Sequence, residues 1–418
     1  MAVNFNTLFL IFLVSVTLIR LWLSVRQIKH VTLHQEQVPK AFSNSVSLEQ
    51  HQKAAHYTTA KVKLSLFNTL IESLWIYALI ELGILSWWNN WLITHLQTSL
   101  LSGILLIAGV TLMGSIIELP LNLYSTFVIE QRFGFNRLTP AMYLSDLFKN
   151  TLIGILIGVP IILAALWMMA SLGTHWWLYA WGAWMLFNIL LLAIYPTWIA
   201  PLFNRFSPLP EGDLKTQVEQ LINTCGFNTS GLYVMDGSKR SSHGNAYFTG
   251  FGKAKRVVFF DTLINSLNTD EILAVLAHEL GHYRLRHVLY RLVSIFVLSL
   301  VFLALLGWFY TSNWFYMGLG HQIPSNAMAL TLFTLILPIL GFPLQPLMSL
   351  FSRKHEFEAD AYASRYAHAH SLISALVKLY KENAATLTPD PLHSAIYDSH
   401  PPASIRIAHL EKLALTAG

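Results

Sequence analysis

Seven long apolar segments constrain this chain more than any other feature of its sequence. They cover residues 5–25, 64–88, 100–124, 151–172, 177–200, 288–310 and 327–350. A helix rises about 1.5 Å per residue, so each segment is long enough to cross the ~30 Å hydrocarbon core of a bilayer. The first is long for a signal peptide and has no small-residue cleavage site, so we expect it to be retained. The sequence therefore predicts a mainly α-helical, polytopic membrane protein with seven transmembrane helices, the last one kinked or irregular near Pro338 and Pro343.

The composition agrees with this prediction. The chain is 54% hydrophobic and only 12% charged, whereas about a quarter of the residues of a soluble domain are charged. Basic residues do not form a run among exposed aromatic residues, which excludes nucleic acid as an expected partner. Cys225 is the single cysteine of the sequence, so no intrachain disulfide can form.

The charged residues predict the orientation of the chain in the membrane. Residues 1–6, 89–99, 171–176 and 311–326 contain no Lys, Arg, Asp or Glu, whereas the opposite set of connections carries the charge. By the positive-inside rule, the N-terminus is expected outside and residues 205–287 on the cytoplasmic side. Within the spans, Glu72, Glu81 and Glu118 are expected to face the bundle interior or a water-filled space, while Arg20 either faces it too or extends to the membrane surface.

A metal-binding helix is predicted over residues 268–287. Asn268 followed by Glu271 is a capping-box signal for its start. His278 and His282 are four residues apart, so they lie about 40° apart around the helix and leave the same face. Two imidazoles at this spacing are typical of a zinc site, and Glu279 beside them is placed to deprotonate a zinc-bound water.

A third zinc ligand is predicted after the seventh apolar segment. Glu356 and Asp360 are four residues apart and share a helix face, so Glu356 could bind the metal while Asp360 orients a zinc-bound imidazole. Two His and one Glu leave the fourth position of a single zinc ion for water, which is the coordination of a catalytic site. His355 and Glu358 are expected to point elsewhere, and His287 is expected at the membrane interface.

The segment between the fifth and sixth spans is expected to be a soluble insertion. Residues 213–225 predict an amphipathic helix, residues 231–235, 245–251 and 256–260 predict strands, and residues 252–255 predict a turn. A strand pair before the zinc helix is either an exposed edge for an extended peptide or a structural hairpin. We thus divide the chain into residues 1–204 (five spans), 205–287 (zinc-peptidase segment), 288–350 (two spans) and 351–418 (the rest of the peptidase domain).

Several separated stretches together resemble the type I CAAX prenyl proteases, which are membrane zinc metallopeptidases. These stretches are residues 119–130 with 134–136, 199–204, 235–240 with 245–248, 278–282, 352–360, and 399–402 with Arg406. The resemblance implies seven helices forming a barrel around a water-filled chamber, which the zinc domain caps. It implies ligands His278, His282 and Glu356 and the general base Glu279, and it places His400 and Arg406 near the scissile peptide. It also suggests that substrate binds along the strand containing Asn245, Ala246, Tyr247 and Phe248.

The sequence therefore predicts an integral-membrane zinc metalloendopeptidase with a peptide or protein substrate, prenylated or not, and the lipid bilayer as partners. A catalytically silent membrane scaffold or peptide-binding chaperone is the alternative, and a transporter using Glu72, Glu81 and Glu118 is a weaker third. Short uncharged loops and a C-terminus without a basic retrieval signal favour a bacterial inner membrane. In a eukaryote, the endoplasmic reticulum is expected, and in a bacterium the role expected is quality control of membrane proteins.

Overall fold

Long helices dominate the structure, a computed structural model that describes residues 1–418 apart from 97, 228, 250–255 and 418. The helices of the first half are α1 (Ala2–Leu33), α2 (Leu48–Ile80), α3 (Ile84–His95), α4 (Ser99–Tyr124), α5 (Gln131–Phe133), α6 (Pro140–Ser171) and α7 (Trp176–Ile194). Those of the second half are α8 (Asp213–Thr224), α9 (Asp261–Ser266), α10 (Thr269–Arg284), α11 (His287–Phe309), α12 (Asn313–Gly318), α13 (Asn326–Gly341), α14 (Gln345–Tyr366), α15 (Ala369–Glu382), α16 (Pro391–Tyr397) and α17 (Ala403–Ala417).

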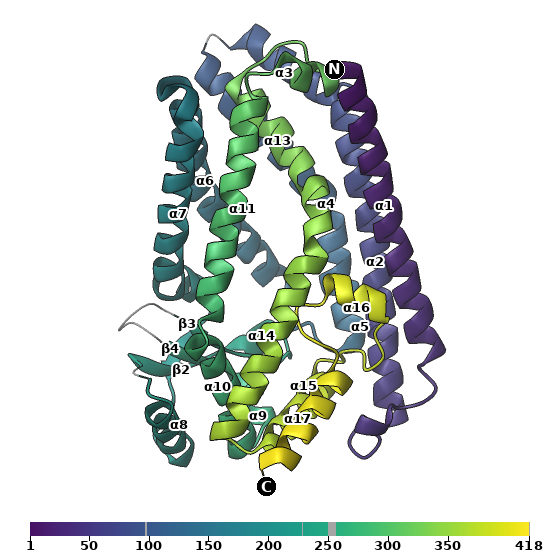
Figure 1. Ribbon diagram of the computed structural model, residues 1–418, viewed down its shortest axis with the longest axis vertical. Coiled ribbons are helices and arrows are strands. Elements are labelled where there is room, and N and C mark those ends of the chain that lie inside the picture. Colours follow the sequence, from purple (N-terminus) through teal and green to yellow (C-terminus); the bar gives the residue numbers. More distant parts are fainter. Residues whose placement is uncertain (97, 228, 250–255, 418) are drawn as a thin grey trace.

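Seven helices of the described chain are long and apolar enough to cross a membrane, as the sequence predicts. In Figure 1 they run along the length of the molecule, with the N-terminus, α3 and the start of α13 at one extremity. The sheet, α10 and the C-terminus lie at the other extremity. The uncharged connections therefore lie at the extremity that contains the N-terminus, and the charged segments lie at the opposite extremity. This is the arrangement that the alternation of uncharged and charged connections along the sequence predicts.

The second predicted span, residues 64–88, has the wrong boundaries. Helix α2 begins much earlier, at Leu48, and ends at Ile80. Gly83 then adopts a left-handed conformation (φ 74°), which redirects the chain before the separate helix α3 begins. The hydrophobicity of the sequence continues through this turn, so the apolar pattern alone does not reveal it.

The seventh span is interrupted where its prolines predict an irregular stretch. Helix α13 ends at Gly341, a 3₁₀ turn covers Phe342–Leu344, and α14 begins at Gln345. Helix α14 then continues as far as Tyr366, so the last membrane span and the predicted third-ligand segment belong to one continuous structure. This continuity fixes the depth of Glu356 relative to the membrane helices.

Arg20, Glu72 and Glu81 have polar partners in the structure, whereas the Glu118 side chain is exposed. Arg20 of α1 donates from Nη1 to Oε2 of Glu72 on α2, at 3.1 Å. The amide of Asn6 donates to Oε1 of Glu81 at 2.7 Å. The ion pair joins α1 to α2, and the side chain of Arg20 remains 32% exposed.

A four-stranded sheet lies at the charged end, in the order β1-β2-β4-β3. Its strands are β1 (Phe206–Pro208), β2 (Gly231–Met235), β3 (Ala246–Thr249) and β4 (Arg256–Phe260). Strands β2 and β4 are parallel, while β1 and β3 are antiparallel to their neighbours and form the two edges. The predicted helix 213–225 and the predicted strands 231–235 and 256–260 are present, and the predicted strand 245–251 contains β3. Residues 250–251 of that strand and the predicted turn 252–255 lie outside the described residues.

Candidate metal centre

The helix that carries both histidines is α10, and its start is fixed by the predicted capping box. The side chain of Asn268 accepts from the backbone N–H of Glu271, and the carboxylate of Glu271 accepts from the backbone N–H of Asn268. Ile272, Leu276 and Leu280 are buried in the core of this end of the molecule. Because the apolar face is buried, the rotation of the helix is fixed and with it the face that carries His278 and His282.

A close approach of α10 to α14 brings the third candidate ligand to these histidines. Gly281 faces α14, and a Cβ atom added there would lie 3.2 Å from Cα of Ala359 and from Cβ of Tyr362. A side chain at this position would push the two helices apart. The glycine within the His-Glu-x-x-His motif therefore allows the backbone contact that places Glu356 opposite the histidines.

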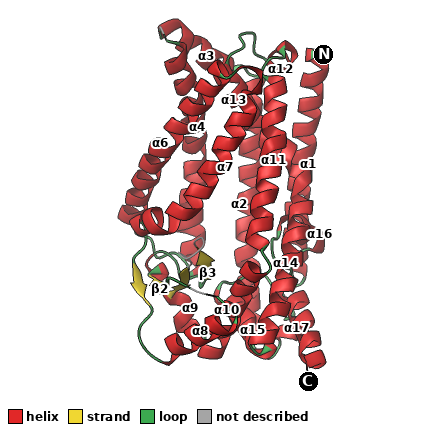
Figure 2. Cartoon of the chain, turned by 60° about the vertical axis from the view of Figure 1, so that its left-hand side comes forward, coloured by secondary structure: helices red, strands yellow, loops and turns green. Residues whose placement is uncertain are grey.

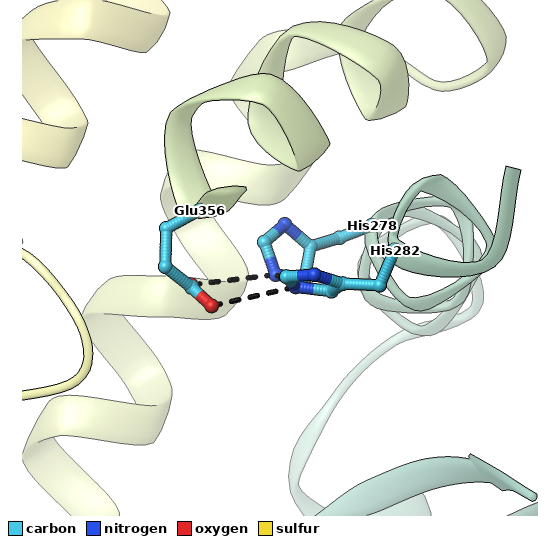
Figure 3. Close-up of side chains that lie close together, drawn as sticks. All are labelled: His278, His282 and Glu356. Carbon is cyan, nitrogen blue, oxygen red and sulfur yellow. Dashed lines mark hydrogen bonds and ion pairs between the residues drawn. The ribbon is translucent and has the colours of Figure 1, made fainter. Parts of the chain in front are cut away.

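The three side chains converge on one point, as Figure 3 shows. His278 Nε2 lies 3.1 Å from His282 Nε2 and 3.5 Å from Glu356 Oε2, and His282 Nε2 lies 3.3 Å from Glu356 Oε1. A tetrahedral zinc ion with bonds of about 2.0–2.2 Å holds neighbouring ligand atoms about 3.3–3.6 Å apart. The spacing and the nitrogen-and-oxygen donor set therefore fit a metal ion of this kind.

The carboxylate of Glu356 gives a second indication of fit. Its side chain is only 5% exposed, and Oε2 makes no hydrogen bond of good geometry within the described part of the chain. Nη1 of Arg406 lies 3.2 Å from this oxygen without forming such a bond, so a metal ion would supply the well-aligned partner that a buried, ionised oxygen requires.

Asp360 lies behind His278 and is completely buried. One of its oxygens is 2.9 Å from Nδ1 of His278, the ring nitrogen that faces away from the candidate metal position. A carboxylate here keeps the proton on Nδ1 and leaves Nε2 free to bind a metal. This contact has the geometry expected for the role that the sequence predicts for Asp360.

Arg406, at the start of α17, contacts the carboxylates rather than open space. Its guanidinium bonds to both oxygens of Asp360, at 2.9 and 2.5 Å, and Nη1 lies 3.2 Å from Oε2 of Glu356. The side chain of Arg406 is only 6% exposed. In this arrangement it neutralises and orients two buried carboxylates of the site.

His400 lies beside the carboxylate of Glu356, and Glu279 follows His278 on α10. His400 Nε2 lies 3.4 Å from Oε1 of Glu356, yet 59% of its side chain is exposed, so it can meet an incoming ligand. Burial lowers the pKa of His400, which favours a neutral ring. Burial raises the pKa of Glu279, and the neighbouring His278 and His282 oppose that shift.

The predicted substrate strand lies beside the zinc helix. Phe248 of β3 packs edge-on against Tyr283 of α10, with ring centroids 4.4 Å apart. Asn245 precedes β3, and Ala246 and Phe248 are buried while Tyr247 is partly exposed. Strand β3 is thus an edge of the sheet next to the helix that carries His282.

Comparisons with known proteins agree with this arrangement. Residues 27–205 match the family described as CAAX prenyl protease N-terminal, five membrane helices, and residues 208–414 match Peptidase family M48. The CAAX prenyl protease 1 homolog of Arabidopsis thaliana is 35% identical, and the alignment covers 98% of each chain. The chain belongs to the CAAX prenyl protease 1 family.

Further relatives extend this membership to the three-dimensional structure. The CAAX prenyl protease 1 of Saccharomyces cerevisiae is 32% identical over 93% of this chain and 91% of its own. The crystal structure of S. mikatae Ste24p matches with a TM-score of 0.91 and 31% identity, covering 97% of this chain and 99% of that one. This CAAX protease homologue is therefore an integral, multi-pass membrane metallopeptidase, as the sequence resemblance implies.

One residue of the CAAX protease homologue is placed differently from the sequence prediction. His287 lies against the candidate site rather than away from it: it is only 5% exposed and its Nδ1 lies 3.0 Å from Nδ1 of His282. The prediction assumed a continuous helix, on which five residues separate two side chains by about 140°. Helix α10 instead ends at Arg284, and a turn through Arg286 (φ 61°) brings His287 back towards the site. No Gly or Pro marks this turn in the sequence, so no local signal predicted it.

Proposed function

We propose that this chain is a zinc metalloendopeptidase in which His278, His282 and Glu356 hold one zinc ion. The observation that carries the proposal is that the nitrogen and oxygen atoms of three metal-binding side chains lie 3.1–3.5 Å apart in a largely buried position. Zinc bound there would polarise a peptide carbonyl and lower the pKa of a bound water. The complete set of candidate ligands and base argues against a catalytically silent scaffold.

In this proposal, Glu279 is the general base. It directly follows His278 on α10 and lies three residues before His282, which places it on the same side of the helix as both ligands. Its role is to take a proton from the attacking water and to pass it to the leaving amine. Asp360 and Arg406 hold the ligands, and the exposed ring of His400 donates a hydrogen bond to the oxyanion that develops on the substrate carbonyl.

The register of the sheet supports β3 as the substrate-binding edge. The N–H of Phe260 donates to the carbonyl of Asn245, which makes these two residues a hydrogen-bonded pair. Such pairs alternate along antiparallel strands, so the next outward-facing main-chain groups belong to Ala246 and Phe248. An extended peptide would pair with these groups and be held straight beside α10. The N–H of Ala246 now donates to the side chain of Asn245, at 2.8 Å, and this contact must open when a peptide pairs there.

We further propose that the substrates are the C-terminal segments of membrane-associated proteins. Curated relatives carry the name CAAX prenyl protease 1, which points to prenylated C-termini. The alternation of charged and uncharged connections supports a cytoplasmic active site. The bacterial inner membrane and a role in quality control of membrane proteins stay predictions, since they depend on loop length and the C-terminus alone.

A matched peptide assay tests the proposed activity. The purified chain in detergent should cleave a farnesylated C-terminal peptide, and removal of zinc with a chelator should abolish cleavage. Glu279→Gln should keep its zinc and lose about 10²–10⁴-fold in turnover, because the base acts on water rather than on the metal. Glu219→Gln, on α8 and largely exposed, is the control and should cleave like the parent. Equal turnover by Glu279→Gln and the parent would exclude this mechanism.

An unmodified peptide of the same sequence tests the substrate class. Faster cleavage of the farnesylated peptide supports recognition of the prenyl group, while equal rates would restrict the proposal to peptide hydrolysis. The orientation is tested separately by reporters inserted near Gly237 and near Asn326, which should read cytoplasmic and external respectively. A cytoplasmic signal from the Asn326 site would contradict the proposed orientation.

A further inference from the structure

A second group of metal-binding side chains lies next to the candidate metal centre. It consists of His287, His355 and Glu358, whose ligand atoms lie within 4.8 Å of one another. The ring of His355 stacks on that of His287, with centroids 4.0 Å apart and planes 10° apart. Two interpretations are possible on geometry alone: a second metal site, or a hydrogen-bond chain that ends on His282.

His287 connects the two groups. It is the first residue of membrane helix α11, and its two ring nitrogens have different partners. Nδ1 lies 3.0 Å from Nδ1 of His282, and Nε2 lies 3.0 Å from Oε2 of Glu358. The left-handed conformation of Arg286 turns the chain so that both contacts form.

The position of each proton decides between the interpretations. His282 faces the candidate metal position with Nε2, so as a neutral ligand it carries its proton on Nδ1. That N–H has to donate, and Nδ1 of His287 is the acceptor 3.0 Å away. His287 then carries its own proton on Nε2, where the carboxylate of Glu358 accepts it.

A metal ion on His287 is incompatible with this arrangement. It would have to replace the proton on Nε2 while Nδ1 still accepts from His282, which would make the ring of His287 an anion. The hydrogen-bond chain therefore excludes a second ion at this position as long as His282 is a metal ligand.

We propose that His287 is a positioning residue that fixes the tautomer and ring orientation of His282, with Glu358 fixing those of His287. The inference rests on the proposed function, because it takes Nε2 of His282 as the metal-binding atom. The two histidine ligands are then supported differently. His278 meets the fully buried carboxylate of Asp360 directly, whereas His282 depends on an imidazole and on Glu358, whose side chain is 41% exposed.

The consequence is that the metal site is linked to a membrane helix. His287 begins α11 and Glu358 belongs to α14, the continuation of the seventh span. The orientation of His282 therefore depends on how these two spans meet at the charged end of the molecule.

Substitutions of His287 test the proposal through zinc affinity rather than activity. The side-chain oxygen of asparagine is bonded to Cγ, as Nδ1 of histidine is, so His287→Asn can still accept from His282 and His287→Leu cannot. Loss of such a partner typically weakens metal binding by 10–100-fold. We expect about that loss in His287→Leu and recovery of most of it in His287→Asn, measured by competition with a chelator on the purified full chain in detergent.

Cobalt(II) loading and a matched variant complete the experiment. The visible spectrum of the cobalt-loaded chain should change in His287→Leu and return towards that of the parent in His287→Asn, since it reports the geometry of the ligands. His355→Leu removes the ring stacked on His287 but no hydrogen bond to His282 among the described contacts. It should bind zinc with the parent affinity.

The outcomes separate this inference from the proposed function. A parent chain that binds no zinc would overturn both. A parent that binds zinc and hydrolyses peptide, with unchanged affinity in His287→Leu, would overturn the inference alone. Two zinc ions per chain, with one lost in His355→Leu, would replace the hydrogen-bond chain by a second metal site. Equal weakening in all three variants would mean a loss of packing and would also overturn it.

Discussion

Replacing Arg406 by methionine separates two roles that this residue could have. The sequence resemblance places Arg406 near the scissile peptide, where it would stabilise the oxyanion. In the structure its guanidinium instead bonds to both oxygens of Asp360 and lies 3.2 Å from Glu356. Arg406→Met keeps much of the side-chain volume but leaves these buried carboxylates without their cation.

The structure gives the expected size of the effect. Removing one partner of a buried ion pair costs about 3–5 kcal/mol, because the other charge stays buried without compensation. For a domain of 150–250 residues, each kcal/mol shifts the unfolding midpoint by about 2–4 °C, so the metal-free variant should unfold roughly 6–20 °C below the parent. Zinc restores a positive charge beside Glu356, so the difference should be smaller in the zinc-loaded protein.

Thermal unfolding of the detergent-solubilised chain, with chelator and with zinc, measures this difference, and zinc content is determined on the same samples. Arg240→Met is the control, because Arg240 pairs with Asp146 away from the metal centre. Its effect should be the same with and without zinc. If Arg406→Met unfolds and binds zinc like the parent while only kcat falls, the residue acts on the reacting atoms and the reasoning from its buried contacts is refuted.

Four further substitutions test three other parts of the structure. Ala246→Pro removes a main-chain donor from the free edge of β3 and should lower kcat/KM at least tenfold with zinc content intact. Tyr247→Pro, in contrast, breaks a hydrogen bond to β4 and should destabilise the fold. Cleavage by Ala246→Pro at the parent rate would contradict the edge-strand proposal. Gly281→Ala places a Cβ atom 3.2 Å from atoms of α14. It should lower the free energy of unfolding by about 1–3 kcal/mol and weaken zinc binding, measured by thermal unfolding and by chelator competition. Parental values for both would contradict the role of Gly281 in bringing α10 close to α14. Asn268→Ala removes the cap of α10 and should lower the free energy of unfolding by about 1 kcal/mol, measured by thermal unfolding. An unchanged unfolding midpoint would mean that the capping box does not stabilise the fold.

The sequence alone determined those features that depend on local pattern. Apolar segments long enough for a bilayer predict seven spans, the charges between them predict which connections share an end, and a capping box predicts the start of α10 at Asn268. The spacing of His278 and His282 predicts their common helix face because helical geometry repeats every few residues. Glu356 could be predicted as the third metal ligand because Asp360 follows it at the same four-residue spacing on a second helix.

Only the tertiary structure decided how distant segments meet. Apolar sequence continues through Gly83, so the break between α2 and α3 is a matter of backbone conformation rather than hydrophobicity. Which of the strands form the edges depends on β4 lying between β2 and β3, a pairing that no local pattern specifies. The contacts of Arg406 with Asp360 require α17 to pack beside α14, and the return of His287 to His282 requires the turn at Arg286. Such contacts depend on the summed packing of elements far apart in the chain, whereas hydrophobic periodicity and charge act through near neighbours.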